Sequence, residues 1–248
     1  MKQITAIIPA RGGSVGIPRK NIALVGEYPL IAYSIAACQL CKNIDRIIVS
    51  TDDEEIARIA KSFGAEIPFM RPAPLATAES TDVGFLRHFF ENIPVKEAAL
   101  IRPTTPFRSP YFMDEVVTKY FEVKEQISGL RTVNEVNENP YKVYKLEEGM
   151  CRGFFPTYKG VKNYTNLPRQ TFPKAYSGNG HIDIVKRETV LTTNTTFGDA
   201  ILAEVCENII DIDSLFDLKL ARHQLEMDNT LLNFLKGAKN DEENDEES

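Results

Sequence analysis

The sequence predicts an α/β fold with three layers, in which a mostly parallel central sheet carries helices on both faces in a Rossmann-like arrangement, with a small antiparallel arm added. Two observations predict it. Short apolar runs typical of buried strands alternate along the chain with longer segments whose apolar residues recur at helical spacing. Glycine-rich or polar segments follow three of the apolar runs, and ligands of open α/β sheets bind beyond the carboxyl ends of the strands.

The first part of the chain shows this alternation clearly. The apolar run 4–9 (ITAIIP) is an expected strand, followed by an expected helix at 29–42 and a strand at 45–50. Residues 53–63 have a helical apolar stripe, and Gly64 stands where a helix C-cap is expected. This order of elements favours parallel strands joined by helical crossovers.

The alternation continues through the next fifty residues. We expect a strand at 66–70, a helix at 81–92 and a strand at 98–101. Ser109 is the expected N-cap of a further helix, with Pro110 at its first position. The segments ARGGSVG, STDD and RPTTPFR each follow a strand and should therefore share one cleft.

Residues 130–180 break the pattern into short, polar, tyrosine-rich segments. We expect an antiparallel excursion from the main sheet that serves in dimerisation or sugar binding. The chain then returns through the strand-like segments 181–186 and 203–213. A last helix begins at Ser214, where Asp217 is positioned to close a capping box.

Composition limits the class of protein. The 248 residues support a single domain over 1–235, followed at 236–248 by an acidic tail that we expect to be disordered. The formal net charge of −6 argues against nucleic-acid binding. No run approaches the ~20 apolar residues of a membrane span, and no signal-peptide pattern occurs, so a cytoplasmic protein without a membrane partner is expected.

Neither the cysteines nor the histidines suggest chemistry of their own. Cys38 and Cys41 form a C-x-x-C in an apolar helical segment, but the other two cysteines form no second close pair, so zinc or redox chemistry is not expected. The chain has three histidines, which are expected to be structural or surface residues: His88, His181 and His223.

The glycine-rich loop after the first strand is the strongest candidate site. Its spacing excludes the G-x-x-x-x-G-K-[ST] phosphate loop, and Ser14 replaces the second glycine of G-x-G-x-x-G. Backbone N–H groups together with Arg11 and Lys20 could hold a triphosphate. A plain surface loop whose glycines satisfy turn geometry is the alternative.

A pair of aspartates is the second candidate site. Asp211 and Asp213 are two residues apart on an expected strand, so their carboxylates would share one face. Two close carboxylates, completed by phosphate oxygens and waters, could bind Mg²⁺. A capping or surface role is the alternative.

Five segments together resemble a known family in order and spacing. They are IIPARGGSVGIPRKNI, IIVSTDDEEIA, RPTTPFR, LPRQ followed by NG, and DIDSLFDLKLA. The family is that of the CMP-sialic acid synthetases, cytidylyltransferases that activate sialic acid and related 2-keto-3-deoxy sugar acids, and the resemblance covers residues 4–225. It implies a nucleotidyltransferase fold, CTP and an acidic sugar as substrates, Mg²⁺ as cofactor and a homodimer.

The resemblance also implies roles for residues. The nucleotide-binding residues would be Ala10, Arg11, Gly13, Ser14, Lys20, Asn21, Arg71 and Ser80. Acceptor-binding residues would be Arg102, Thr104, Arg169, Gln170, Asn179 and His181, with Arg108 a further candidate for the acceptor carboxylate. The metal ligands would be Asp211 and Asp213, and the catalytic residues Arg11, Lys20 and Asp211.

Two positions depart from the family pattern. Val15 stands where most members have lysine, so one phosphate-facing charge is missing unless Arg19 or another cation replaces it. Arg102 stands where glutamine is usual. Two alternatives to the family reaction therefore stay open: a nucleotidyltransferase with another nucleotide or a sugar-phosphate acceptor, and a nucleotide-binding module without catalysis.

Overall fold

The computed structural model describes residues 3–14, 16–207, 209–227 and 230–237. Val15, the position of the missing cation, lies outside the described residues, as does the expected acidic tail from residue 238 onward. The remaining expectations for the fold concern residues that the structure does describe.

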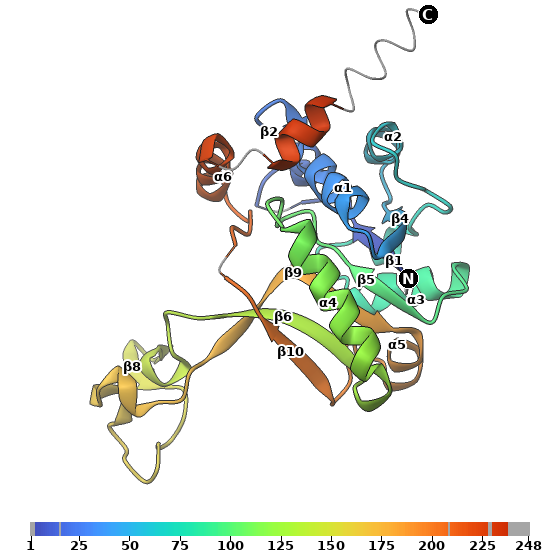
Figure 1. Cartoon of the computed structure of the whole chain (residues 1–248). Coiled ribbons are helices and arrows are strands. Elements are labelled where there is room, and N and C mark those ends of the chain that lie inside the picture. Colours follow the sequence, from blue (N-terminus) through green and yellow to red (C-terminus); the bar gives the residue numbers. More distant parts are fainter. Residues whose placement is uncertain (1–2, 15, 208, 228–229, 238–248) are drawn as a thin grey trace, which may run out of the picture.

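A six-stranded sheet forms the centre of the molecule, in the order β10-β6-β9-β5-β1-β4 (Figure 1). Its strands are β1 (Ile4–Pro9), β4 (Ile44–Ser50), β5 (Glu97–Leu100), β6 (Gly129–Glu135), β9 (Tyr176–Lys186) and β10 (Ile201–Val205). Strand β9 runs antiparallel to both of its neighbours, whereas the other three pairings are parallel. The mostly parallel sheet that the sequence predicts is therefore confirmed.

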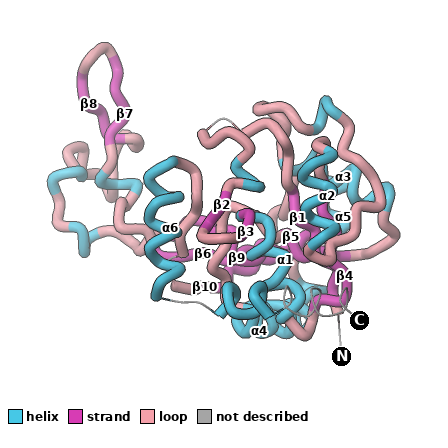
Figure 2. Tube along the Cα trace, turned by 90° about the horizontal axis from the view of Figure 1, so that it is seen from above, coloured by secondary structure: helices cyan, strands magenta, loops and turns pink. Residues whose placement is uncertain are grey.

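Helices cover both faces of the sheet, which gives the three predicted layers (Figure 2). One apolar cluster joins β1 to α1 (Leu30–Leu40), α2 (Glu54–Ser62), α4 (Pro110–Val123) and α6 (Leu215–Met227). A second apolar cluster joins β1 to α3 (Asp82–Asn92) and α5 (Arg187–Thr193). Adjacent strand residues face opposite sides, so Ile8 packs in the first cluster and Ile7 in the second.

The predicted helix starts of α4 and α6 are confirmed. The Ser109 hydroxyl accepts a hydrogen bond from the Phe112 N–H at 3.3 Å, as an N-cap does. At α6, the Asp217 carboxylate accepts from the Ser214 N–H at 2.8 Å, and the Ser214 hydroxyl accepts from the Asp217 N–H at 3.3 Å. These reciprocal bonds form the capping box and fix where the preceding segment enters the helix.

Two expected strands form only in part. In residues 66–70, only Glu66 pairs with the sheet, through a parallel bridge to Ile48, and Pro68 has no N–H with which to extend the ladder. In residues 203–213, the strand ends at Val205, and residues 209–213 have no regular structure. The backbone of Ile212 instead donates to the Thr104 carbonyl at 2.8 Å, which places Asp211 and Asp213 beside the loop after β5.

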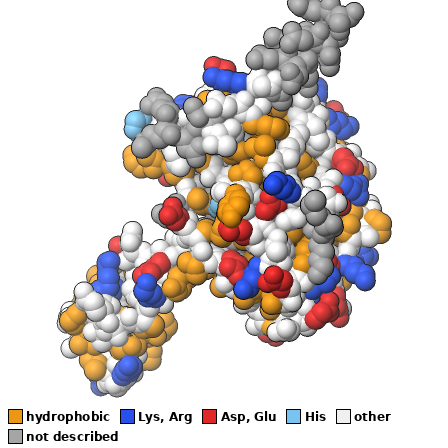
Figure 3. Space-filling view, in the orientation of Figure 1, with side chains coloured by type: hydrophobic (Ala, Val, Ile, Leu, Met, Phe, Trp, Pro, Cys, Tyr) orange, Lys and Arg blue, Asp and Glu red, His pale blue; other side chains and the backbone are white. Residues whose placement is uncertain are grey.

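Residues 136–175, between β6 and β9, leave the sheet and form a separate arm (Figure 1). The expected range 130–180 therefore also includes most of β6 and the start of β9. A hairpin of β7 (Tyr144–Glu147) and β8 (Met150–Gly153) pairs antiparallel, as predicted. Hydrophobic side chains lie on the arm's surface (Figure 3). The most exposed of them are Leu146, Met150, Phe154 and Tyr144.

Cys38 and Cys41 belong to the core beneath α1, where burial raises the pKa of both thiols. The Cys41 thiol lies 3.0 Å from a carboxylate oxygen of Asp114 and donates to it. Among the residues that the structure describes, no three His, Cys, Asp or Glu side chains are grouped to hold a metal ion. Within the same ranges, no helix is long and apolar enough to span a membrane.

The cap of α4 gives a test of the fold. Ser109→Ala should lower the free energy of unfolding by about 1 kcal/mol, because the Phe112 N–H loses its acceptor. Urea denaturation measures this, with Ser62→Ala at the exposed end of α2 as the control, expected to change stability by less than about 0.5 kcal/mol. Equal effects of the two substitutions would contradict the assigned cap.

Candidate active site

A cavity of about 400 Å³ lies beyond the carboxyl ends of β1 and β5. It is lined by Pro9, Arg11, Ser14, Gly16, Lys20, Asn21, Arg71, Leu75, Ala78, Ser80, Asp82, Phe85, Arg102, Pro103, Thr104 and Asp213. The glycine loop and the loop after β5 thus share one cleft, as predicted. The segment after β4 lies against it, since Asp52 accepts a hydrogen bond from the Gly12 N–H at 2.9 Å.

The glycine loop packs directly against the segment that carries Asp213. A Cβ atom on Gly16 would lie 2.3 Å from the Asp213 carbonyl oxygen, so this approach requires glycine. Asn21 is buried and donates to the Arg11 carbonyl at 2.9 Å, which ties the two ends of the loop together. Two segments almost two hundred residues apart in the sequence therefore form one wall.

The predicted phosphate-binding cations are both in the cleft. Lys20 Nζ lies 2.8 Å from a carboxylate oxygen of Asp213, so the expected phosphate ligand and the expected metal ligand form an ion pair. Arg11 donates to the Thr77 carbonyl. Arg19 does not line the cavity and instead pairs at the surface with Asp53 at 3.1 Å and Glu55 at 2.8 Å.

Arg71 and Ser80 form part of the opposite wall. Arg71 is 6% exposed, and it donates to the Ser50 hydroxyl at 3.0 Å and to the Ser50 carbonyl at 2.6 Å. Burial lowers the pKa of Arg71 to about 10, so it remains charged at neutral pH. Ser80 accepts from the Thr77 N–H at 3.0 Å, which fixes the turn before α3.

The arginines predicted to meet the acceptor carboxylate differ in their surroundings. Arg102 lines the cleft but forms an ion pair with Asp82 at 2.5 Å. Arg108 is buried among backbone carbonyls and the Ser34 hydroxyl, so its candidacy as an acceptor ligand is wrong. Arg169 and its neighbour Gln170 are exposed on the arm and do not line this cavity.

Asn179 and His181 are buried below the cleft and do not line it. The Asn179 amide donates to the Cys206 sulfur at 2.9 Å, and its oxygen accepts from the His181 N–H at 3.1 Å. The His181 ring accepts from the Ser109 N–H at 3.1 Å. The His181 ring therefore supports Ser109 at the end of the loop after β5, whereas the Asn179 side chain links β9 to Cys206. Neither side chain lines the cavity in which the acceptor is expected.

The remaining predicted residues divide between the cleft and its surroundings. Thr104 and Asp213 line the cavity, whereas Asp211 is exposed beside it. Ala10 is buried and donates to the Ser50 carbonyl at 2.9 Å. Gly13 is exposed, and a Cβ atom added to it would have nothing within 4 Å.

Sequence reasoning missed several residues of the cleft. Asp82 is the first residue of α3, and its place at the start of a predicted helix was a usable signal. Phe85, one turn later, lies under the Arg71 guanidinium, 4.8 Å from ring centroid to Cζ. No local pattern marks Phe85 or Leu75, because Phe85 is placed by the packing of α3 against the sheet and Leu75 lies in the segment before α3, next to Gly84.

The chain also matches known proteins. A model of the family described as cytidylyltransferase matches residues 5–148, which is more than half of the chain. The chain belongs to the cytidylyltransferase family. Members of this family generally use a divalent metal.

The chain is similar to two curated proteins in sequence and to one solved structure in fold. The N-acylneuraminate cytidylyltransferase of Escherichia coli is 32% identical over 88% of this chain, which spans 51% of that protein, about half its length. The CMP-N,N'-diacetyllegionaminic acid synthase of Campylobacter jejuni is 32% identical over 92% of this chain and 97% of that protein. A CMP:2-keto-3-deoxy-manno-octonic acid synthetase structure complexed with CTP shares the fold, with a TM-score of 0.67 and 14% identity, covering 92% of this chain and 99% of that one.

The contact between the glycine loop and Asp213 can be tested by stability. Gly16→Ala should lower the free energy of unfolding of this cytidylyltransferase family member by about 1–3 kcal/mol, because the added Cβ overlaps the Asp213 carbonyl. Gly13→Ala is the matched control and should have little effect, since nothing lies within 4 Å of its added Cβ. Urea denaturation without ligands compares the two, and equal losses would contradict the packing.

The buried His181 side chain predicts how folding stability depends on pH. Burial, together with the nearby charge of Arg108, lowers the pKa of His181 to about 4. Between about pH 6.5 and 4 the unfolded chain binds a proton that the folded chain does not, so stability falls as pH falls, by up to about 1.4 kcal/mol per pH unit. His181→Gln should remove this contribution.

Urea denaturation of both proteins across that pH range measures the effect. Burial raises the pKa of Asp183 to about 6, but this group is present in both proteins, so the difference between their pH slopes isolates His181. Identical slopes would mean that the His181 pKa is not depressed.

Proposed function

We propose that this protein transfers CMP from CTP to a nonulosonic or related 2-keto-3-deoxy sugar acid. The anomeric hydroxyl oxygen attacks the α-phosphorus, the bond from that phosphorus to the bridging oxygen breaks, pyrophosphate leaves and the hydroxyl proton is released. The observation that carries the proposal is the shared cleft, which Arg11, Ser14 and Lys20 of the glycine loop line together with Asp213 and the loop after β5. The C. jejuni relative, matched over nearly its full length, is named for the synthesis of a CMP-linked acid of this class.

The glycine loop would bind the triphosphate. Lys20 is only 15% exposed and projects into the cleft, where a cation interacts more strongly with phosphate than it does at the surface. Arg11 adds a second positive charge at the other end of the loop. Both cations would stabilise charge on the phosphates in the transition state, and phosphoryl-type transfer depends mainly on such positioning and neutralisation.

Asp211 and Asp213 fit a magnesium ion in their donor chemistry. Carboxylate oxygens are ligands that Mg²⁺ prefers, with phosphate oxygens and waters completing its coordination. Both aspartates are exposed on either side of the buried Ile212, and Asp213 reaches the cleft. When bound, the ion would neutralise charge on the triphosphate. Lys20, now paired with Asp213, would then turn to the phosphates.

We further propose a cytoplasmic homodimer that uses the arm. Arg169 and Gln170, the acceptor-binding residues suggested by resemblance, are exposed on the arm and absent from this chain's own cavity lining. The arm also exposes Leu146 and Met150, at 75% and 60% of their surface, which a second subunit could cover. If the arm of a second subunit reached the cleft, Arg169 and Gln170 of that subunit would contact the acceptor there. Size-exclusion chromatography with light scattering tests the dimer.

The reaction itself is tested by pyrophosphate release. The purified protein is incubated with Mg²⁺, each of the four nucleoside triphosphates, and a panel of 2-keto-3-deoxy sugar acids and sugar 1-phosphates. Release with CTP and a sugar acid is expected, in which case Val15 is a tolerated change. Release only with another nucleotide or a sugar phosphate, or nucleotide binding without release, would overturn the proposal.

Replacement of the metal-binding aspartates gives a sharper prediction. Asp211→Ala and Asp213→Ala should each lower kcat/KM at least ~100-fold, because charge neutralisation at the phosphates is lost. Asp199→Asn, an exposed aspartate between α5 and β10, is the control and should retain activity. Unaltered turnover in both alanine variants, across a titration of Mg²⁺, would contradict the metal assignment.

A further inference from the structure

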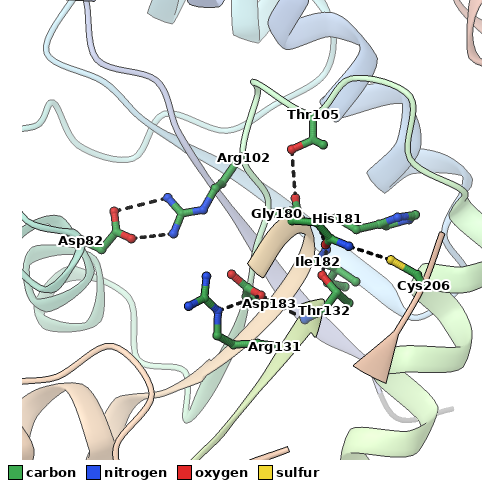
Figure 4. Close-up of polar contacts among 11 residues, drawn as sticks. Asp82, Arg102, Thr105, Arg131, Thr132, Gly180, His181, Ile182, Asp183 and Cys206 are labelled. Atoms are coloured by element: carbon green, nitrogen blue, oxygen red, sulfur yellow. Dashed lines mark hydrogen bonds and ion pairs between the residues drawn. The ribbon is translucent and has the colours of Figure 1, made fainter. Parts of the chain in front are cut away.

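The ion pair between Arg102 and Asp82 joins two elements that line the cleft (Figure 4). Arg102 follows β5, and Asp82 is the first residue of α3. Both terminal nitrogens of the guanidinium face the carboxylate, at 2.5 Å and 3.4 Å. The side chains are 27% and 37% exposed, and both line the cavity, so a ligand there can contact each of them.

The surroundings of Arg102 hold it in this position. Its backbone carbonyl accepts a hydrogen bond of 2.6 Å from the buried Arg108 guanidinium. Its aliphatic stem packs on Gly180, where an added Cβ would lie 3.2 Å from the Arg102 Cδ, and whose φ of +69° favours glycine. With backbone, stem and guanidinium all fixed, Arg102 is preorganised toward Asp82.

The charge of Arg102 is already compensated. Asp82 is its direct partner, and the carboxylates of Asp183 and Asp211 also act on it, so the pKa of Arg102 stays raised although the side chain is partly buried. Asp183 lies beneath in a second pair with Arg131, at 3.8 Å (Figure 4). An acceptor carboxylate placed at Arg102 would therefore meet Asp82 as well, and like charges side by side are unfavourable.

We propose that Asp82 and Arg102 act as one net-neutral unit that determines acceptor specificity by hydrogen bonding an uncharged polar substituent, and that the acceptor carboxylate binds elsewhere. Arg102 offers N–H donors and Asp82 offers acceptor oxygens. An acylamido group, with one N–H and one C=O, or a pair of hydroxyls satisfies both. This inference rests on the proposed function and names the part of the acceptor that meets this wall.

A double-mutant cycle tests it, with Arg102→Gln, Asp82→Asn and the double variant. KM and kcat are measured for the sugar acid that supports turnover, and for its analogue in which the carboxylate is reduced to an alcohol. Arg102→Gln alone should raise the KM for the acid at least ~10-fold, because the unpaired Asp82 then gives the cleft a net negative charge that disfavours an acidic sugar. The double variant should be within about 3-fold of the wild type, because its two amides supply donor and acceptor without net charge.

The acid-to-alcohol preference decides between the two roles of Arg102. If the Arg102–Asp82 pair binds a neutral group, the double variant should keep the preference for the acid. Its ratio of kcat/KM for the acid to kcat/KM for the alcohol should stay within about 3-fold of the wild-type ratio. A collapse of that ratio in both Arg102→Gln and the double variant would make Arg102 the partner of the carboxylate and overturn the inference. The exposed Arg46–Glu66 pair, replaced by Gln at both positions, is the matched control outside the cleft.

Thermal unfolding of the same variants without ligands separates this inference from the proposed function. Each single variant should lower Tm more than the double variant does, because each leaves one charge of the pair unpaired. Strictly additive shifts would refute the pair, whether or not the protein is active. Absence of pyrophosphate release by the wild type with every acid would instead refute the proposed function, and the Tm comparison of the variants would still test the ion pair.

Discussion

The cleft depends on one buried charge, the guanidinium of Arg108. It donates to the His181 carbonyl at 2.9 Å, to the Ser34 hydroxyl at 2.7 Å, and to the carbonyls of Arg102 and Gly180 at 2.6 Å and 3.3 Å. A buried charge is tolerated only when its hydrogen bonds are satisfied, so these four acceptors must remain in place. Burial lowers the pKa of Arg108 to about 10, which leaves it protonated at neutral pH. Helix α1, strand β9 and the loop after β5 are thereby held together beneath the cleft.

Charge pairing organises the cleft above this support. Lys20 pairs with Asp213 and Arg102 with Asp82, so these two cations each have a carboxylate partner in the free protein. The two pairs differ in what they can do. Lys20 is at the end of a glycine loop, and in the proposed function it would exchange Asp213 for phosphate oxygens. Arg102 is fixed at its backbone and stem, so its ion pair with Asp82 is a fixed part of the cleft wall.

Much of the fold could be predicted from sequence because its signals are local. Apolar runs marked the strands, and Ser109 and Ser214 marked helix starts through hydrogen bonds within one turn. Where the outcome depends on a single proline or on distant partners, prediction failed. The expected strand at 66–70 reduces to one bridge before Pro68, and the aspartate segment joins the loop after β5 in place of extending β10.

The same distinction holds for the site. The glycine loop and Lys20 were predictable because they follow the first strand, and Asp213 was expected from the family resemblance; all three line one cavity. Whether an arginine is free or paired is not a local property. Arg108 and Arg102 stand six residues apart in one motif, yet one is enclosed by backbone carbonyls and the other faces Asp82 from another helix. The roles of Arg169 and Gln170 depend in addition on whether a second subunit is present.

The most direct test of the proposed site is a crystal structure of the protein with CTP and Mg²⁺. We expect the triphosphate against the glycine loop, the metal held by Asp211 and Asp213, and Lys20 turned from Asp213 to a phosphate oxygen, with the Arg102–Asp82 pair intact. Nucleotide bound outside this cleft, or bound within it while Lys20 still pairs with Asp213 and no metal touches either aspartate, would contradict it.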